Sequence, residues 1–179
     1  NDSKSRAGGV LYSDYSLGRF FAEAARQPWF ENTIFLVTAD HCASSAGRTE
    51  IPLQKYHIPA LILAPGLIEP GVVDGIVSQI DLMPTLLSLL NMSYDSHFYG
   101  RSIFDPAYVN RAFIATYQDL GYLEGDTFTI LSPVRRFEQY RVVPTEENPH
   151  HLEAMERKDA VQVDRAIGYY QTSCKWNKR

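Results

Sequence analysis

Apolar residues recur at intervals of three and four between residues 10 and 27, which is the spacing of a helix with one buried face. Polar side chains occupy most of the other positions, and Pro28 ends the pattern. The spacing therefore predicts an amphipathic helix over 10–27 that packs on a larger body. Its predicted apolar face consists of Leu11, Tyr15, Gly18, Phe21, Ala22 and Ala25.

Two nearly continuous apolar runs follow, TIFLVTA at 33–39 and IPALILAPG at 58–66. Strands of a parallel sheet are covered on both faces and therefore appear in a sequence as unbroken hydrophobic segments. Each run predicts such a strand, and the small and polar stretch 42–56 between them is typical of a loop. A second helix is predicted within the segment 78–92, SQIDLMPTLLSLLNM, with Asp81 as its N-cap.

This order of helix, strand, strand and helix is typical of a layered α/β domain. Beyond it, short alternating segments separated by turn residues predict antiparallel strands, and helical spacing returns from about Glu153. The predicted fold class is α/β. Residues 1–104 would form a layered α/β/α sandwich with a mainly parallel sheet, and 105–179 a small antiparallel sheet with a closing helix. No domain boundary is needed within 1–179.

Composition and charge narrow the function classes. The chain has 179 residues, enough for one domain with a sizeable core. Its net charge of −4 argues against nucleic acid as an electrostatic partner. No run approaches the roughly 18 apolar residues of a membrane-spanning helix. The two cysteines, Cys42 and Cys174, define no disulfide framework.

The chemistry is concentrated at Asp40 and His41, directly after the first apolar run. In open α/β sheets, ligands bind outside the carboxyl ends of the strands. A carboxylate oxygen and an imidazole nitrogen at such an end suit Zn²⁺ or Mn²⁺. In the alternative interpretation, Asp40 caps the following turn and His41 is only a polar surface residue. The pair by itself leaves both interpretations open.

Four segments in order carry a resemblance to a known family: FENTIFLVTADH, HIPALILAPG, VSQIDLMPTLLSLLNM and FYGRSIF. Their order and spacing resemble the alkaline phosphatase/sulfatase superfamily. Within it they look most like the lipoteichoic acid synthase-like phosphoglycerol transferase branch. The resemblance runs from about Val10 to Phe104, and the late segment AIGYYQTS resembles the C-terminal helix of that branch.

The resemblance implies a metal-bound Thr or Ser nucleophile, an acidic ligand that precedes it, and a later Asp-His pair that Asp40 and His41 match. Sulfatases usually have Asp-Asn at this place, so His41 favours phosphoryl over sulfuryl transfer. The nucleophile and the acidic ligand would lie upstream of Asn1. We therefore expect the C-terminal part of a longer enzyme that supplies two ligands to a Mn or Zn site and is inactive alone.

The same resemblance implies the partners and the location. The substrate would be a phospholipid headgroup or another phosphate or sulfate ester. The parent protein would be anchored in the bacterial cell membrane through an N-terminal part, with its catalytic domain extracytoplasmic (periplasmic). An exposed sheet edge would favour partner-dependent folding or a homo-oligomer.

Two residues are candidates for contacting the substrate. Arg48 lies in the loop after the Asp-His pair, and a guanidinium matches phosphate oxygens bidentately. His57 precedes the second apolar run and could reach the rim of the cleft. Either side chain could instead be a solvated loop residue. The adjacent His150 and His151 fit a surface loop, and no role follows for them.

Three function classes remain open. The first is a metal-dependent phosphoglycerol or related headgroup transferase. The second is a sulfatase or phosphodiesterase-type hydrolase of the same superfamily, and the third is a non-catalytic module that binds a headgroup or a partner.

Overall fold

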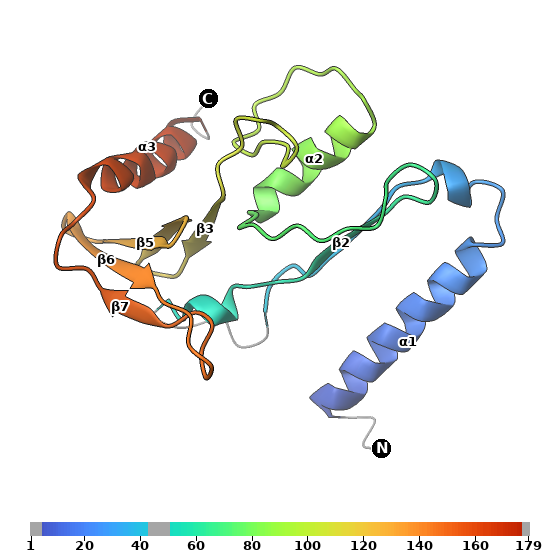
Figure 1. Cartoon of the computed structure of the whole chain (residues 1–179), viewed down its shortest axis with the longest axis horizontal. Coiled ribbons are helices and arrows are strands. Elements are labelled where there is room, and N and C mark those ends of the chain that lie inside the picture. The colour runs from blue at the N-terminus through green and yellow to red at the C-terminus, as the bar shows by residue number, and fades with distance from the viewer. Residues whose placement is uncertain (1–4, 43–50, 177–179) are drawn as a thin grey trace. The chain divides into compact units, whose positions relative to one another are not determined.

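The computed structural model describes residues 5–42 and 51–176. A helix, two strands and a second helix come first, and a run of five strands followed by a helix comes after them, in the order that the hydrophobic pattern predicts (Figure 1). The chain divides into two compact units. Unit 1 comprises residues 1–37 and 60–72, and unit 2 comprises 38–59 and 73–179.

Unit 1 consists of a long helix and a pair of strands. Helix α1 starts four residues before its predicted first residue, because the Ser5 hydroxyl accepts a hydrogen bond from the N–H of Gly8 at 3.1 Å and caps the helix. Aromatic rings surround Phe35, with centroids 5.4–6.2 Å from its ring. The elements are α1 (Arg6–Ala24), η1 (Phe30–Asn32), β1 (Phe35–Thr38), whose last residue is counted in unit 2, and β2 (Ala60–Leu63), which pairs with β1.

The apolar positions of unit 1 are less buried than their pattern predicts. Leu11 and Tyr15, on the predicted apolar face of α1, are 60% and 61% exposed. Leu61 in β2 is 55% exposed, and the residues of β1 are half-buried or exposed. Burial on both faces of these strands is therefore not seen in the part of the chain that the structure describes.

Unit 2 is built around the predicted antiparallel sheet. Its five strands follow chain order, and each pairs antiparallel with the next. Helix α3 (Ala160–Trp176) contacts β4 and β5. The Tyr170 hydroxyl donates to the carbonyls of Ile114 and Gly121 at 3.0 and 2.7 Å. The strands are β3 (Arg111–Ala115), β4 (Leu120–Glu124), β5 (Thr127–Ser132), β6 (Arg136–Val142) and β7 (Leu152–Ala154).

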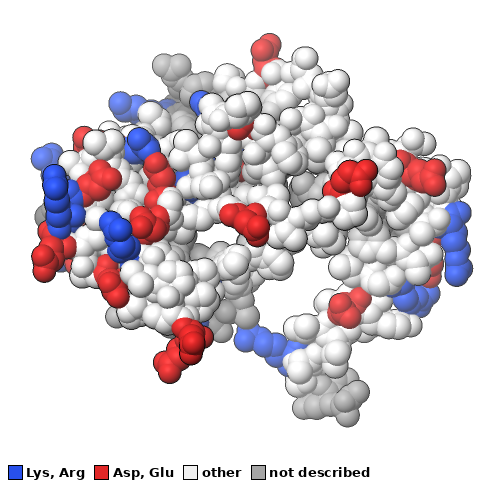
Figure 2. Space-filling model, viewed as in Figure 1, with Lys and Arg blue, Asp and Glu red and all other residues white. Residues whose placement is uncertain are grey.

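Charged side chains of both signs cover this part of unit 2. On the face drawn in Figure 2, Lys and Arg alternate with Asp and Glu over the region of the sheet and α3. Exposed ion pairs join Arg141 to Asp126 at 3.3 Å and Arg165 to Glu124. Among the described residues, no helix combines the length and the apolar character that crossing a membrane requires.

Asp81 occupies the predicted N-cap position of the second helix, but its side chain does not cap that helix. Helix α2 (Leu82–Leu89) follows a short 3₁₀ turn, η3 (Gln79–Asp81), and the Asp81 side chain makes no capping hydrogen bond to α2. Its carboxylate instead accepts the N–H of Ser78 at 3.1 Å, while the Ser78 hydroxyl accepts the N–H of Asp81. This capping box belongs to η3.

The Asp81 carboxylate is fully buried and forms an ion pair with Arg111. Two guanidinium nitrogens donate to its two oxygens at 2.9 and 3.1 Å. The Tyr108 hydroxyl and the N–H of Arg101 add further hydrogen bonds, each at 2.9 Å. Burial opposes the charge of Arg111, but the bonds to Asp81 and Tyr169 outweigh it, and the pKa of Arg111 lies above its ordinary value.

Residues around α2 also bind the segment that follows it. The Thr85 hydroxyl donates to the carbonyl of Asp81 at 2.7 Å and accepts the N–H of Ile103 at 3.1 Å. A Cβ atom on Gly100 would overlap the carbonyl oxygen of Ile80, so only glycine fits there. The sequence segments DLMPT and GRSI are therefore held against each other by hydrogen bonds and close backbone packing.

Replacing Arg111 by Met should lower the free energy of unfolding by about 3–5 kcal/mol, because it leaves the buried Asp81 carboxylate without its cation. Denaturant titration of the purified protein measures this. The matched control is Arg141→Met, which removes an exposed ion pair and should cost less than about 1 kcal/mol. Equal losses for the two variants would contradict the assigned role of the buried pair.

Candidate functional site

The Asp-His pair lies in the turn that follows β1. The N–H of His41 donates to Oδ1 of Asp40 at 2.9 Å, which fixes the carboxylate against the turn. The Nδ1 atom of His41 lies 3.0 Å from the carbonyl oxygen of Cys42. Because a carbonyl can only accept, Nδ1 carries the proton, and the lone pair of the neutral ring is on Nε2.

The two remaining atoms that could bind a metal face each other. Nε2 of His41 lies 3.4 Å from Oδ2 of Asp40, and the two side chains are 71% and 87% exposed. Two ligands about 2.1 Å from a tetrahedral zinc ion would themselves be about 3.4 Å apart. The atom types and their separation therefore fit a shared cation. Within residues 5–42 and 51–176, no group of three or more His, Cys, Asp and Glu side chains could hold a metal. The assignment of both as metal ligands stays a prediction.

A second segment lies beside this turn. The Cys42 thiol donates to the carbonyl of His57 at 3.1 Å. The His57 ring contacts that of His150 edge to face, with the centroids 5.4 Å apart. The structure therefore brings His150, for which the sequence indicated no role, to His57. His150 lies between β6 and β7, more than ninety positions further along the chain, so no local pattern could have revealed the contact.

The remaining predicted substrate contact, Arg48, lies outside the described residues. Gln79, which the sequence did not single out, approaches the turn instead. Its side-chain amide donates to the carbonyls of Ala39 and Asp40 at 3.2 and 3.4 Å. Nothing in the spacing of the sequence distinguishes this glutamine from other polar residues near a helix start.

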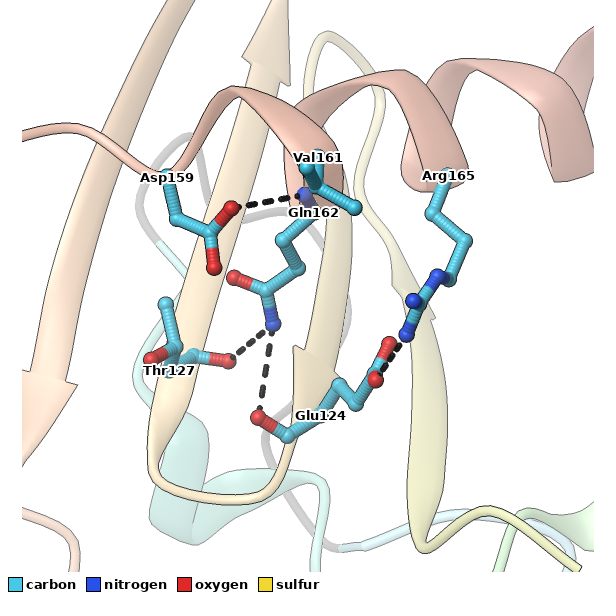
Figure 3. Close-up of a pocket in the computed structure, with 6 residues that line it drawn as sticks. All are labelled: Glu124, Thr127, Asp159, Val161, Gln162 and Arg165. Carbon is cyan, nitrogen blue, oxygen red and sulfur yellow. Dashed lines mark hydrogen bonds and ion pairs between the residues drawn. The ribbon is translucent and has the colours of Figure 1, made fainter.

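A pocket between α3 and the β4–β5 hairpin contains none of the predicted site residues (Figure 3). The polar groups that line it bind one another: the Gln162 amide donates to the carbonyls of Thr127 and Glu124 at 2.9 and 3.3 Å, and Asp159 accepts the N–H of Gln162 at 3.1 Å. Arg165 pairs with Glu124. These contacts join α3 to the sheet.

A solved structure with a similar fold identifies the fold of this chain. The chain is similar over 97% of its length to the crystal structure of a protein in the alkaline phosphatase superfamily from Vibrio parahaemolyticus, with a TM-score of 0.83 and 31% sequence identity. The fold is that of the alkaline phosphatase superfamily, which confirms the predicted fold class.

The sequence identifies the family. Residues 2–92 match the sequence model of the Sulfatase family, and this is just over half of the 179 residues. The chain therefore belongs to the sulfatase family. An arylsulfatase from Clostridium perfringens (strain 13 / Type A) is 30% identical over 107 residues. That similarity covers 55% of this chain and 22% of the arylsulfatase, and the chain spans 43% of the Vibrio protein. It thus corresponds to less than half the length of either relative.

The protein should lose stability in mild acid, in part through His150. Partial burial, and then the charge of His57, lower the pKa of His150 from its ordinary value of 6.5. The unfolded chain therefore binds the proton more readily, and the free energy of unfolding falls as the pH drops below about 6.5.

Denaturant unfolding at pH 7, 6 and 5 tests this. The His150→Gln variant should lose less stability over this range than the unmodified protein does. His151→Gln, at the exposed neighbouring position, is the matched control and should follow the unmodified protein. Identical pH dependence in the His150→Gln variant and the unmodified protein would show that the His57–His150 contact does not perturb titration.

Proposed function

We propose that this chain is the part of a metal-dependent phosphoryl transferase that supplies two metal ligands, Asp40 and His41. The observation that supports this most directly is the 3.4 Å distance between Nε2 of His41 and Oδ2 of Asp40 in the turn after β1. Both side chains are exposed. Membership in the sulfatase family supports an enzymatic role for the protein that contains this chain.

Each residue of the turn has a part in this proposal. Asp40 contributes a carboxylate oxygen and charge, and His41 contributes the neutral Nε2 while its Nδ1–H is held by the carbonyl of Cys42. A Zn²⁺ or Mn²⁺ ion bound there would lower the pKa of a hydroxyl nucleophile and stabilise charge on the phosphoryl oxygens. We expect that nucleophile, a Thr or Ser, and a further acidic ligand elsewhere in the full-length protein.

The proposed substrate is a phosphodiester, of which a phospholipid headgroup is the specific case suggested by the likeness to phosphoglycerol transferases. An imidazole in place of an amide as the second ligand favours phosphoryl transfer. The position of His57 beside the turn makes it the candidate to contact the substrate anion, together with Arg48. We further propose that the full-length protein acts at the outer face of a bacterial cell membrane.

A sulfate-ester hydrolase is the second candidate, because the arylsulfatase of Clostridium perfringens resembles this chain over 107 residues. Turnover of bis(p-nitrophenyl) phosphate, p-nitrophenyl phosphate and p-nitrophenyl sulfate by the full-length protein with Mn²⁺ or Zn²⁺ separates the two. Preference for the diester supports phosphoryl chemistry, which a transferase and a phosphodiesterase-type hydrolase share, and preference for the sulfate supports the sulfate-ester hydrolase. Headgroup binding without turnover of any ester would indicate a binding module.

Replacing either Asp40 or His41 by Ala in the full-length protein should remove the bound metal and lower kcat at least about a hundredfold, because each variant lacks a direct ligand. Elemental analysis measures the metal, and diester hydrolysis measures kcat. His151→Ala removes an exposed imidazole and should leave both unchanged. Full metal content in the Asp40→Ala and His41→Ala proteins would rule out this ligand assignment.

Replacing His57 by Gln should raise KM for the diester by about fivefold with little change in kcat, as expected for the loss of one hydrogen bond to the substrate. Steady-state kinetics at saturating metal measures both constants, and His151→Gln is the matched control. An unchanged KM would remove His57 from the substrate site and leave the metal assignment unaffected.

A further inference from the structure

The turn that carries Asp40 and His41 is held from one side by the side-chain amide of Gln79. The Nε2 atom of Gln79 donates to the carbonyl oxygens of Ala39 and Asp40, at 3.2 and 3.4 Å. These two carbonyls lie immediately before the side chains that are proposed to bind the cation. The contact joins residues 39 to 40 positions apart in the sequence, so it is a tertiary contact and not a feature of the turn itself.

The backbone of Gln79 is anchored by the buried ion pair of Asp81 and Arg111. It is the first residue of η3, and Asp81 at the end of η3 is fully buried in its ion pair with Arg111. The capping box formed by Ser78 and Asp81 fixes the turn of η3 on either side of Gln79. The backbone that carries the amide is therefore anchored in the core of unit 2.

The side chain of Gln79 itself is exposed and fills no core position. Its removal would open no cavity, and it would leave the contacts of Asp81 intact. What would change is the orientation of the Asp40 peptide group, to which the Asp40 side chain and the N–H of His41 are both attached. That N–H donates to Oδ1 of Asp40, so a shift of the peptide would turn the carboxylate as well.

We propose that Gln79 is a positioning residue for the metal site. Its amide locks the Asp40 peptide so that Oδ2 of Asp40 and Nε2 of His41 face one cation. The role of the cation in this inference rests on the proposed function. The contact between the Gln79 amide and the turn does not, because it is seen in the described structure. Preorganised ligands bind a metal more tightly because less conformational freedom is lost on binding.

The test compares Gln79→Met, which keeps the length of the side chain and removes the donor, with the full-length unmodified protein. Mn²⁺ titration should give a dissociation constant about threefold to tenfold higher for the variant, the effect of one lost hydrogen bond. In the metal-free proteins, hydrogen exchange of the His41 amide should be faster in the variant, since the turn is released. The melting temperature without metal should stay the same.

Gln54→Met is the matched control, because Gln54 is an exposed glutamine of η2 (Leu53–Lys55) in the same unit. It should change neither Mn²⁺ affinity nor exchange at His41. Equal exchange at His41 in the Gln79→Met and Gln54→Met proteins would overturn the proposal. A melting temperature that falls in step with metal affinity would also overturn it, because Gln79 would then act through general stability.

Failure of the proposed function gives a different result. If the unmodified protein and an Asp40→Ala variant bind Mn²⁺ equally poorly, the cation assignment fails, and the positioning of metal ligands fails with it. Faster exchange at His41 in Gln79→Met would then still show that the amide holds the turn. The two readouts therefore separate an error about the metal from an error about Gln79.

Discussion

The buried ion pair of Asp81 and Arg111 is the constraint on which the rest of unit 2 depends. Removing two charges from water is costly, and the cost is offset only when every lone pair and proton finds a partner. Both carboxylate oxygens are bonded here, to the guanidinium, to the Tyr108 hydroxyl and to backbone N–H groups. The guanidinium also lies 5.4–5.8 Å from the centroids of three aromatic rings, of which Tyr169 of α3 is one. The contacts of this one buried pair therefore join η3, β3 and α3.

This rigidity is needed because the candidate site is exposed. Asp40 and His41 project into solvent, where a cation and a substrate could reach them under the proposed function. Functional residues on loops depend on a rigid scaffold for their orientation. In this protein the scaffold reaches the loop through η3 and the Gln79 amide. The segments that resemble the family in sequence, the one around Asp40 and the one around Asp81, are thus in physical contact, as are the segments around Thr85 and Ile103.

Local sequence patterns predicted the elements well and their long-range contacts poorly. The apolar run before Asp40 and the alternating segments after residue 105 gave strands where they were expected, because side-chain periodicity reflects local geometry. Asp81 stands at the predicted N-cap position of α2, but its side chain does not cap that helix. An aspartate before a helix is usually a cap, and its real partner, Arg111, lies thirty residues away. The sequence also indicated no role for His150 or Gln79, because their contacts are likewise with residues far away in the chain. The helix itself was predicted correctly, but its predicted apolar face was not: Leu11 and Tyr15 are exposed, and the buried residue of α1 is Ala24.

The sequence by itself determined the α/β class, the sulfatase-family motifs, and the neighbouring carboxylate and imidazole at the end of a strand. These follow from residues close together in the chain, whose backbone spacing is known in advance. Only the tertiary structure decided that Oδ2 of Asp40 and Nε2 of His41 converge, that Gln79 holds their turn, and that Asp81 is buried against Arg111. The first depends on side-chain rotamers, and the other two depend on contacts between segments that are distant in the sequence. Such contacts form only when the chain folds, so the periodicity of the sequence does not predict them.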